Sequence, residues 1–272
     1  MALDWLFMFP LGWGIMGAAF ATSIATTAGC LIAVIYILRH ARTLRLIRIK
    51  TSRKSLALSL RNIGYQWHIG SSALLGEGTL AMLILLGNFI FMRHLGDDGV
   101  GAFGIACYYT PFIFMVGNAI AQSAQPIISF NFGLGAPLRV RQAEKTALIT
   151  AAVCGLVVTA AFTVMPEWLV GLFVSLDNGA ARIAVDGFPY FASGFLFFIF
   201  NLTAIGYFQS VERIRTATTF ALMRGFVLLV PSFLIMPDIA GTHGIWLAMP
   251  TAEALTMLAI VGYYIKKKRN GK

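Results

Sequence analysis

One acidic residue, Glu77, lies inside the long apolar run GEGTLAMLILLGN, with no other charged residue within a helical turn. If that run crosses a membrane, an ionised carboxylate there costs on the order of 2.5–3.5 kcal/mol on insertion scales, so its presence indicates a task or a partner. A carboxylate in such surroundings can bind and release a proton or a small cation near neutral pH. We therefore predict that Glu77 is a cation-coupling residue, with a structural hydrogen-bonded glutamate as the alternative.

A second acid, Glu253, lies in the run WLAMPTAEALT, and a base, Arg224, lies about two turns into the run 216–237. Glu253 is the natural partner of a buried base, and a second cation-coupling site is the other interpretation. For Arg224 we expect the long side chain to reach along its helix to the membrane surface.

A polar face follows on the next apolar run, where Asn118, Gln122, Gln125 and Ser129 recur at intervals of four, three and four residues. This spacing places the four side chains on one side of a helix. In lipid such a face must point to other helices or to a water-filled cavity. A seam of hydrogen bonds between helices and a face that lines a substrate cavity are both open as interpretations.

Two thinner polar stripes are predicted on other runs. Asn88 lies eleven residues after Glu77, three helical turns along the same face. Tyr190 and Asn201 belong to a similar stripe on the run 187–209. We include Asn88, Tyr190 and Asn201, with Asn118, Gln122 and Gln125, among the candidate substrate-cavity residues.

The elements that hold these residues must be membrane helices. Hydrophobic residues make up 58% of the chain and charged residues only 12%, too little polar surface for a water-soluble protein of this size. Only helices and closed barrels satisfy their backbone groups in hydrocarbon. The apolar runs have helix length, roughly 20 residues, and do not alternate over about 10 residues as barrel strands do. The chain is therefore predicted to be an all-α integral membrane protein.

We predict about seven transmembrane helices, separated by turn-forming or charged segments. Their expected ranges are 14–38, 66–94, 100–126, 146–166, 187–209, 216–237 and 243–265. The first nine residues are apolar and lack the basic start and cleavage site of a signal peptide, so we interpret them as the tail of a preceding helix.

The basic residues predict the orientation of these helices. Most of the 21 lysines and arginines fall in four segments, at 39–61, 139–145, 213–215 and 266–272, and in a seven-helix arrangement all four lie on one side. By the positive-inside rule that side, with the C-terminus, is cytoplasmic. Because the bases sit at membrane edges without exposed aromatic residues between them, nucleic acid is not an expected partner.

Metal and enzyme chemistry have little support in the sequence. The three cysteines, Cys30, Cys107 and Cys154, are scattered through apolar runs and form no disulfide or metal-binding pattern. The runs contain no cluster of His, Cys and Asp and no pairing of a nucleophile with a base. We therefore predict neither a metal site nor an enzyme.

Several segments resemble the multidrug and toxic compound extrusion (MATE) transporters. The stretch QPIISFNFG, Gln125–Gly133, with the bases that follow it, is similar to the end of the family's eighth helix. GWGIMGAA, Gly12–Ala19, resembles the start of the sixth helix, and Glu77 matches the intramembrane glutamate of the seventh. Pro231, Gly244-Ile245-Trp246 and Pro250 fit the eleventh and twelfth helices. The resemblance runs from about residue 2 to 265 and is greatest to the bacterial MepA-type branch.

This resemblance implies a division of the chain into three parts. Residues 1–38 would be the end of an N-terminal lobe, residues 39–64 a basic cytoplasmic linker, and residues 65–272 a complete six-helix C-terminal lobe with a basic tail. Some family members also carry an aspartate on the tenth helix, and none occurs between Gly187 and Ser210. Glu77 would then be the only ion-site acid shared with the family.

The resemblance also implies a function. A MATE transporter of a bacterial inner membrane exports amphipathic or cationic drugs in exchange for protons or sodium, without a bound cofactor, and its partners are the lipid bilayer and its substrates. Because such transport needs two lobes, a missing N-terminal lobe or a second chain is an expected partner. A lipid flippase of the same superfamily and a non-transporting remnant, or half of a split transporter, are the alternatives.

Overall fold

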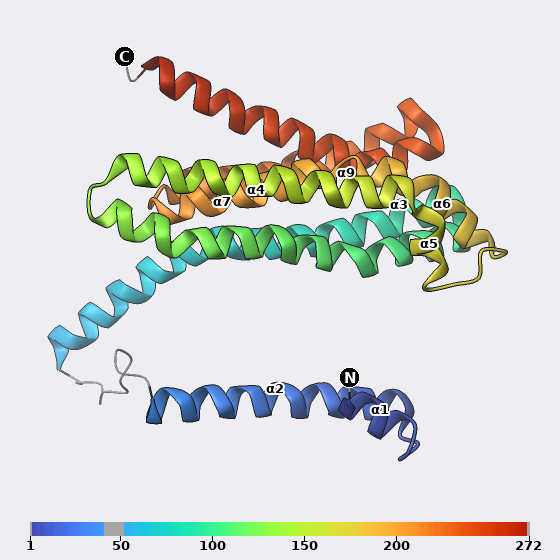
Figure 1. Ribbon diagram of the computed structural model, residues 1–272, viewed down its shortest axis with the longest axis horizontal. Helices are drawn as coiled ribbons and strands as arrows, with labels where there is room; N and C mark the ends of the chain where they lie inside the picture. Colours follow the sequence, from blue (N-terminus) through green and yellow to red (C-terminus); the bar gives the residue numbers. More distant parts are fainter. Residues whose placement is uncertain (1, 41–51, 271–272) are drawn as a thin grey trace. The chain divides into compact units, whose positions relative to one another are not determined.

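The computed structural model describes residues 2–40 and 52–270 (Figure 1). The chain divides into two compact units, Met1–Arg61 and Asn62–Lys272. The described elements are all helical, with no β-strand among them, as predicted.

In the first unit, a short helix precedes a long one. α1 (Ala2–Met8) and α2 (Gly14–Arg39) are joined by a turn in which Gly12 and Gly14 adopt positive φ angles of 64° and 52°, a conformation that glycine adopts without steric cost. α2 has 26 residues, enough to cross a bilayer, and only Gly17 and Ala21 are buried in it. The predicted helix at 14–38 is confirmed.

The second unit contains most of the long helices. α3 begins in the last residues of the first unit and continues through the second unit. The elements are α3 (Arg53–Gly133), α4 (Pro137–Val164), α5 (Pro166–Gly171), α6 (Gly179–Ala192), α7 (Phe195–Ser210), α8 (Ile214–Leu222), the π-helical turn η1 (Met223–Val227) and α9 (Leu229–Asn270).

Two of these helices are broken at glycines. In α3, Gly96 has φ 65° and ψ −154°, and in α9, Gly241 has φ 57° and ψ −137°. The apolar part of α3, Ala73–Gly133, has 61 residues. As a straight α-helix it would be about 90 Å long, three times the hydrocarbon thickness of a bilayer, so a reversal of direction is needed. Figure 1 shows the two halves of α3 running back along each other, and Phe91 stacks on Phe103 across the break at 4.6 Å.

Among the described residues, four helices are long and apolar enough to cross a membrane, or five if the bent pair α6 and α7 is one span. Two predicted boundaries were wrong. The bases at 139–145, expected in a loop, lie in the first turns of α4, because Pro137 begins that helix. The predicted helix 187–209 is interrupted at Ser193–Gly194, where α6 and α7 meet at 47°.

Glycines let the helices of the second unit pack closely. A Cβ atom at Gly155 of α4 would lie 2.8 Å from the Leu196 backbone of α7, and one at Gly187 of α6 would lie 2.0 Å from the Trp246 ring of α9. Small residues at helix interfaces are typical of membrane bundles. This packing holds α4 against α7 and α6 against α9, and α7 forms one wall of the site described next.

Candidate functional site

A cavity of about 460 Å³ lies in the second unit, between the two halves of α3, α7, α8 and η1. Its walls combine small, apolar and polar side chains. The lining residues are Gly70, Ala73, Gly76, Glu77, Phe114, Asn118, Ala121, Gln122, Gln125, Leu202, Ile205, Gly206, Gln209, Ala221 and Arg224.

Four of the predicted site residues meet in this cavity. Glu77 comes from the first half of α3, and Asn118, Gln122 and Gln125 come from the second half. The three amide side chains share a face, as their spacing predicts, and α3 doubles back at Gly96 so that this face lies across from Glu77. Ser129, the last member of the stripe, donates its hydroxyl to the carbonyl of Ser210 at 3.1 Å. The stripe is therefore divided between a cavity wall and a helix contact.

The Glu77 side chain is exposed, and no hydrogen bond or ion pair to its carboxylate occurs among the described residues. Small residues precede it on the helix. Gly70, Ala73 and Gly76 line the same wall, and a Cβ atom at either glycine would meet nothing within 4 Å. The carboxylate therefore has room for a ligand beside it.

The other acid, Glu253, is 1% exposed and lies behind the cavity wall in a buried polar group. Arg224 Nε donates to its Oε1 at 2.5 Å. Asn201 Nδ2 donates to its Oε2 at 2.7 Å and to its backbone carbonyl at 2.8 Å. The Arg224 guanidinium also lies over the Phe198 ring, 4.1 Å from its centroid. The expectation that Arg224 reaches the membrane surface is wrong, because Glu253 compensates its charge inside the protein and the arginine is only 1% exposed.

The buried Arg224 lies in the π-helical turn η1. The Leu228 amide donates to the Met223 carbonyl at 2.8 Å, which widens the helix by one residue at this point. η1 also approaches α3 closely, since a Cβ atom at Gly225 would lie 2.1 Å from Thr79 Oγ1. Such π-helical insertions are frequent at functional sites.

Two polar atoms of the buried group are unpartnered. Arg224 Nη2 and Asn201 Oδ1 are buried and have no hydrogen-bond partner among the described residues. Because Arg224 also lines the cavity, the buried group touches the cavity wall at this side chain.

Two predicted cavity residues lie elsewhere, and Asn201 belongs to the buried group. Asn88 donates to the carbonyl of Ile84 in its own helix at 2.8 Å. Tyr190 stacks on His243, with ring centroids 4.5 Å apart, and His243 lies 3.0 Å from Asp186. Neither side chain lines the cavity.

Sequence reasoning missed two lining residues, Gln209 and Arg224. The cavity face of α7 consists of Leu202, Ile205, Gly206 and Gln209, which recur at helical spacing. A single polar residue at the end of this apolar face is the sequence signal that could have identified Gln209 as a lining residue. For Arg224 the signal was a base and an acid in neighbouring apolar runs.

No group of three or more metal-ligating side chains is found in the described part of the chain.

Proteins of known name are similar to this chain in sequence. The multidrug export protein MepA of Staphylococcus aureus (strain bovine RF122 / ET3-1) is 24% identical over 264 residues, covering 94% of this chain and 55% of the relative. MepA of Staphylococcus saprophyticus is 23% identical, with the same two coverages. The chain therefore spans about half the length of the curated relatives it matches.

Solved structures share the fold. An outward-facing multidrug resistance MATE family transporter of the MOP superfamily has a TM-score of 0.83 at 19% identity, covering 98% of this chain and 59% of its own. A MOP superfamily transporter from Pyrococcus furiosus, described with a binding pocket of reverse polarity, also has a TM-score of 0.83, at 16% identity with the same coverages. The family model described as MatE matches residues 78–234, more than half of the sequence. The chain belongs to the MatE family.

Proposed function

We propose that this chain is the C-terminal lobe, with the end of the N-terminal lobe, of a secondary transporter that exports amphipathic or cationic compounds in exchange for protons or sodium. The observation that carries the proposal is the cavity in which Glu77, free of any partner among the described residues, faces three amide side chains. The membership in the MatE family and the similarity to the MepA proteins support it.

In this proposal Glu77 carries the coupling cation. In one state the carboxylate is ionised and attracts a proton, a sodium ion or a cationic substrate, and in the other it is neutralised by the coupling ion. Asn118, Gln122 and Gln125 offer both donors and acceptors, which suits ligands of varied structure. The apolar part of the wall, with Phe114 and Leu202, suits the hydrophobic part of an amphipathic compound.

We further propose that the working transporter contains a second lobe. The Gln122 and Gln125 side chains are exposed, and a polar face toward lipid costs roughly 1–2 kcal/mol for each unsatisfied group on model-peptide scales. Alternating access moves one lobe against another around the site. A missing N-terminal lobe, from another chain or from a longer form of this one, would cover this face.

The span count and the division of the chain belong to the same proposal. The break at Gly96 would divide α3 into two spans, and the break at Ala240–Gly241 would divide the continuous segment of α8, η1 and α9 into two more. α2, α4 and the bent pair α6 and α7 would supply the other three. Residues 1–38, 39–64 and 65–272 would then be the end of the first lobe, the basic linker and the second lobe. The part of this linker at residues 41–51 lies outside the described residues.

The apolar helices and the bacterial relatives support a multi-pass protein of a bacterial inner membrane. We propose a cytoplasmic C-terminus because the four basic segments would lie on one side. A reporter fused after Lys272 should report the cytoplasm, and a cysteine placed at Asp97 should be labelled from outside the cell. Labelling of both positions from the same side would contradict this orientation.

A second candidate function is that of a non-transporting partner chain in the membrane. Drug accumulation in bacteria that lack their major pumps separates the two. We expect the chain alone to leave accumulation unchanged, and the chain together with an N-terminal MATE lobe to lower it when a proton or sodium gradient is present. Unchanged accumulation with both lobes at normal membrane abundance would refute the transport proposal.

A further inference from the structure

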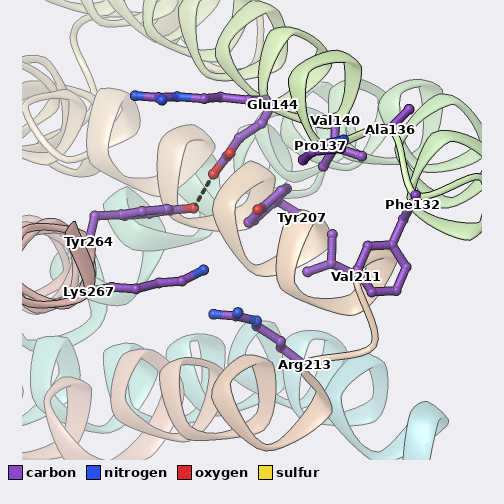
Figure 2. A pocket seen from close by; sticks show the side chains of 12 residues that line it. Phe132, Ala136, Pro137, Val140, Glu144, Tyr207, Val211, Arg213, Tyr264 and Lys267 are labelled. Carbon is purple, nitrogen blue, oxygen red and sulfur yellow. Dashed lines mark hydrogen bonds between the residues drawn. The ribbon is translucent and has the colours of Figure 1, made fainter. Parts of the chain in front are cut away.

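A second pocket, of about 620 Å³, lies at one end of the helices of the second unit (Figure 2). It is formed by the α3–α4 turn, the end of α7, the segment before α8 and the last turns of α9. Its lining residues are Phe132, Gly135, Ala136, Pro137, Val140, Arg141, Glu144, Tyr207, Val211, Arg213, Tyr264 and Lys267. None of them belongs to the cavity of Glu77.

Three bases from three segments converge on this pocket. Arg141 comes from α4, Arg213 from the turn between α7 and α8, and Lys267 from the last turns of α9. Figure 2 shows the Lys267 amine and the Arg213 guanidinium pointing into the pocket toward each other. Two cations that approach each other repel, so this arrangement favours an anion between them.

The single acid in the pocket, Glu144, offsets only part of this positive charge. Glu144 Oε1 accepts a hydrogen bond of 2.6 Å from the Tyr264 hydroxyl, the contact drawn as a dashed line in Figure 2. Among the described residues, none of the three bases forms an ion pair with an acid. With three bases and one carboxylate, the lining carries an excess of positive charge.

The beginning of α4 adds to this positive character. Gly135, with φ 65°, turns the chain so that Ala136 and Pro137 lie at the pocket. Ala136 at the N-cap position offers no side-chain hydrogen bond to the first turn. The positive end of the α4 helix dipole therefore lies at the same pocket as the three bases.

The opposite part of the lining is apolar, with Phe132, Val140 and Val211. An anion that is wholly hydrated gains nothing from such a wall, whereas a phospholipid carries apolar acyl chains that begin a few bonds from its phosphate. Basic pockets between helices at a membrane face are a known way to hold anionic lipid headgroups.

We propose that this pocket binds the phosphate group of an anionic membrane phospholipid. The phosphodiester would lie between Arg213 and Lys267, with Arg141 and the start of α4 beside it, and the acyl ester region would contact Phe132 and Val211. This inference does not depend on transport, since it concerns a separate pocket and a different ligand.

The chain offers a matched control for a test. The pocket variant is Arg141→Gln/Arg213→Gln/Lys267→Gln, and the control variant is Arg139→Gln/Arg215→Gln/Lys266→Gln. The control removes the same charge from positions one or two residues away that do not line this pocket. Each purified full-length protein is titrated with phosphatidylglycerol, with phosphatidylcholine and with inorganic phosphate, and bound ligand is counted by native mass spectrometry.

We expect the parent and the control to bind one phosphatidylglycerol more tightly than phosphatidylcholine. The pocket variant should bind phosphatidylglycerol on the order of 100-fold more weakly, since each basic side chain near a lipid headgroup contributes about fivefold. The single variants Lys267→Gln and Lys266→Gln repeat the comparison with one exposed charge, in case the triple variant does not fold.

Equal loss of phosphatidylglycerol binding in the pocket and control variants would overturn the proposal, because it would indicate that surface charge alone attracts the lipid. Equal binding of phosphatidylcholine would also overturn it, as would inorganic phosphate that competes as well as the lipid.

Discussion

The two intramembrane acids, Glu77 and Glu253, have similar sequence surroundings and different environments in the folded protein. Glu77 is exposed at a cavity, with small residues beside it and no partner among the described residues. Glu253 is 1% exposed and held by Arg224 and Asn201. A buried, compensated carboxylate is poorly placed to exchange cations, whereas an open one can do so. An acid in an apolar run therefore indicates an important residue, and its contacts in the folded protein indicate whether its role is ion exchange or structural pairing.

The largest loss of folding stability is expected when the buried pair of Arg224 and Glu253 is broken. Glu253→Gln leaves the Arg224 charge buried without compensation, which costs about 3–5 kcal/mol of folding free energy. Unfolding of the detergent-solubilised chain by denaturant would measure this loss.

The double variant Arg224→Leu/Glu253→Leu is the control for the pair. Because it removes both charges, it should recover most of the stability lost in the single variant. If Glu253→Gln is as stable as the parent, the pair does not compensate charge as described, and the contrast with Glu77 fails.

A smaller loss of stability is expected at the close contact between Gly225 and Thr79, next to Arg224. Gly225→Ala would place a methyl group against Thr79 Oγ1, and overpacking of this kind costs about 1–3 kcal/mol. Gly76→Ala is the matched change on the cavity side, where nothing lies within 4 Å of the new Cβ. Thermal unfolding of both variants should lower the midpoint only for Gly225→Ala, and equal midpoints would contradict the packing of η1 on α3.

The smallest effect on stability is expected from Glu77→Gln. The change keeps the size of the side chain and removes the cost of a charge in the membrane, so the chain should insert and fold at least as well as the parent. Membrane abundance and the unfolding midpoint check this. A loss of stability similar to that of Glu253→Gln would show that Glu77 has a structural partner after all.

The sequence alone predicted the helical membrane class and the shared face of Asn118, Gln122 and Gln125, whereas it paired Glu77 with Asn88, which does not line the cavity. Both follow from local properties, namely apolar length and the 3.6-residue period. The buried Arg224 lies in a π-helical turn, next to the close approach of Gly225 to Thr79, and pairs with an acid 29 residues further along the chain. None of these is a periodic signal. The break at Ser193–Gly194 lies where Gly194 packs against Pro250, a contact between distant residues, and the helix 187–209 was predicted as one piece.

The most direct test of the central claim, that Glu77 couples ion and substrate movement, is gradient-driven drug efflux by vesicles that contain this chain and an N-terminal lobe. We predict that Glu77→Gln abolishes the dependence of efflux on a proton or sodium gradient while the protein is present at the parent's abundance. Efflux that keeps its rate and its gradient dependence in this variant would contradict the account.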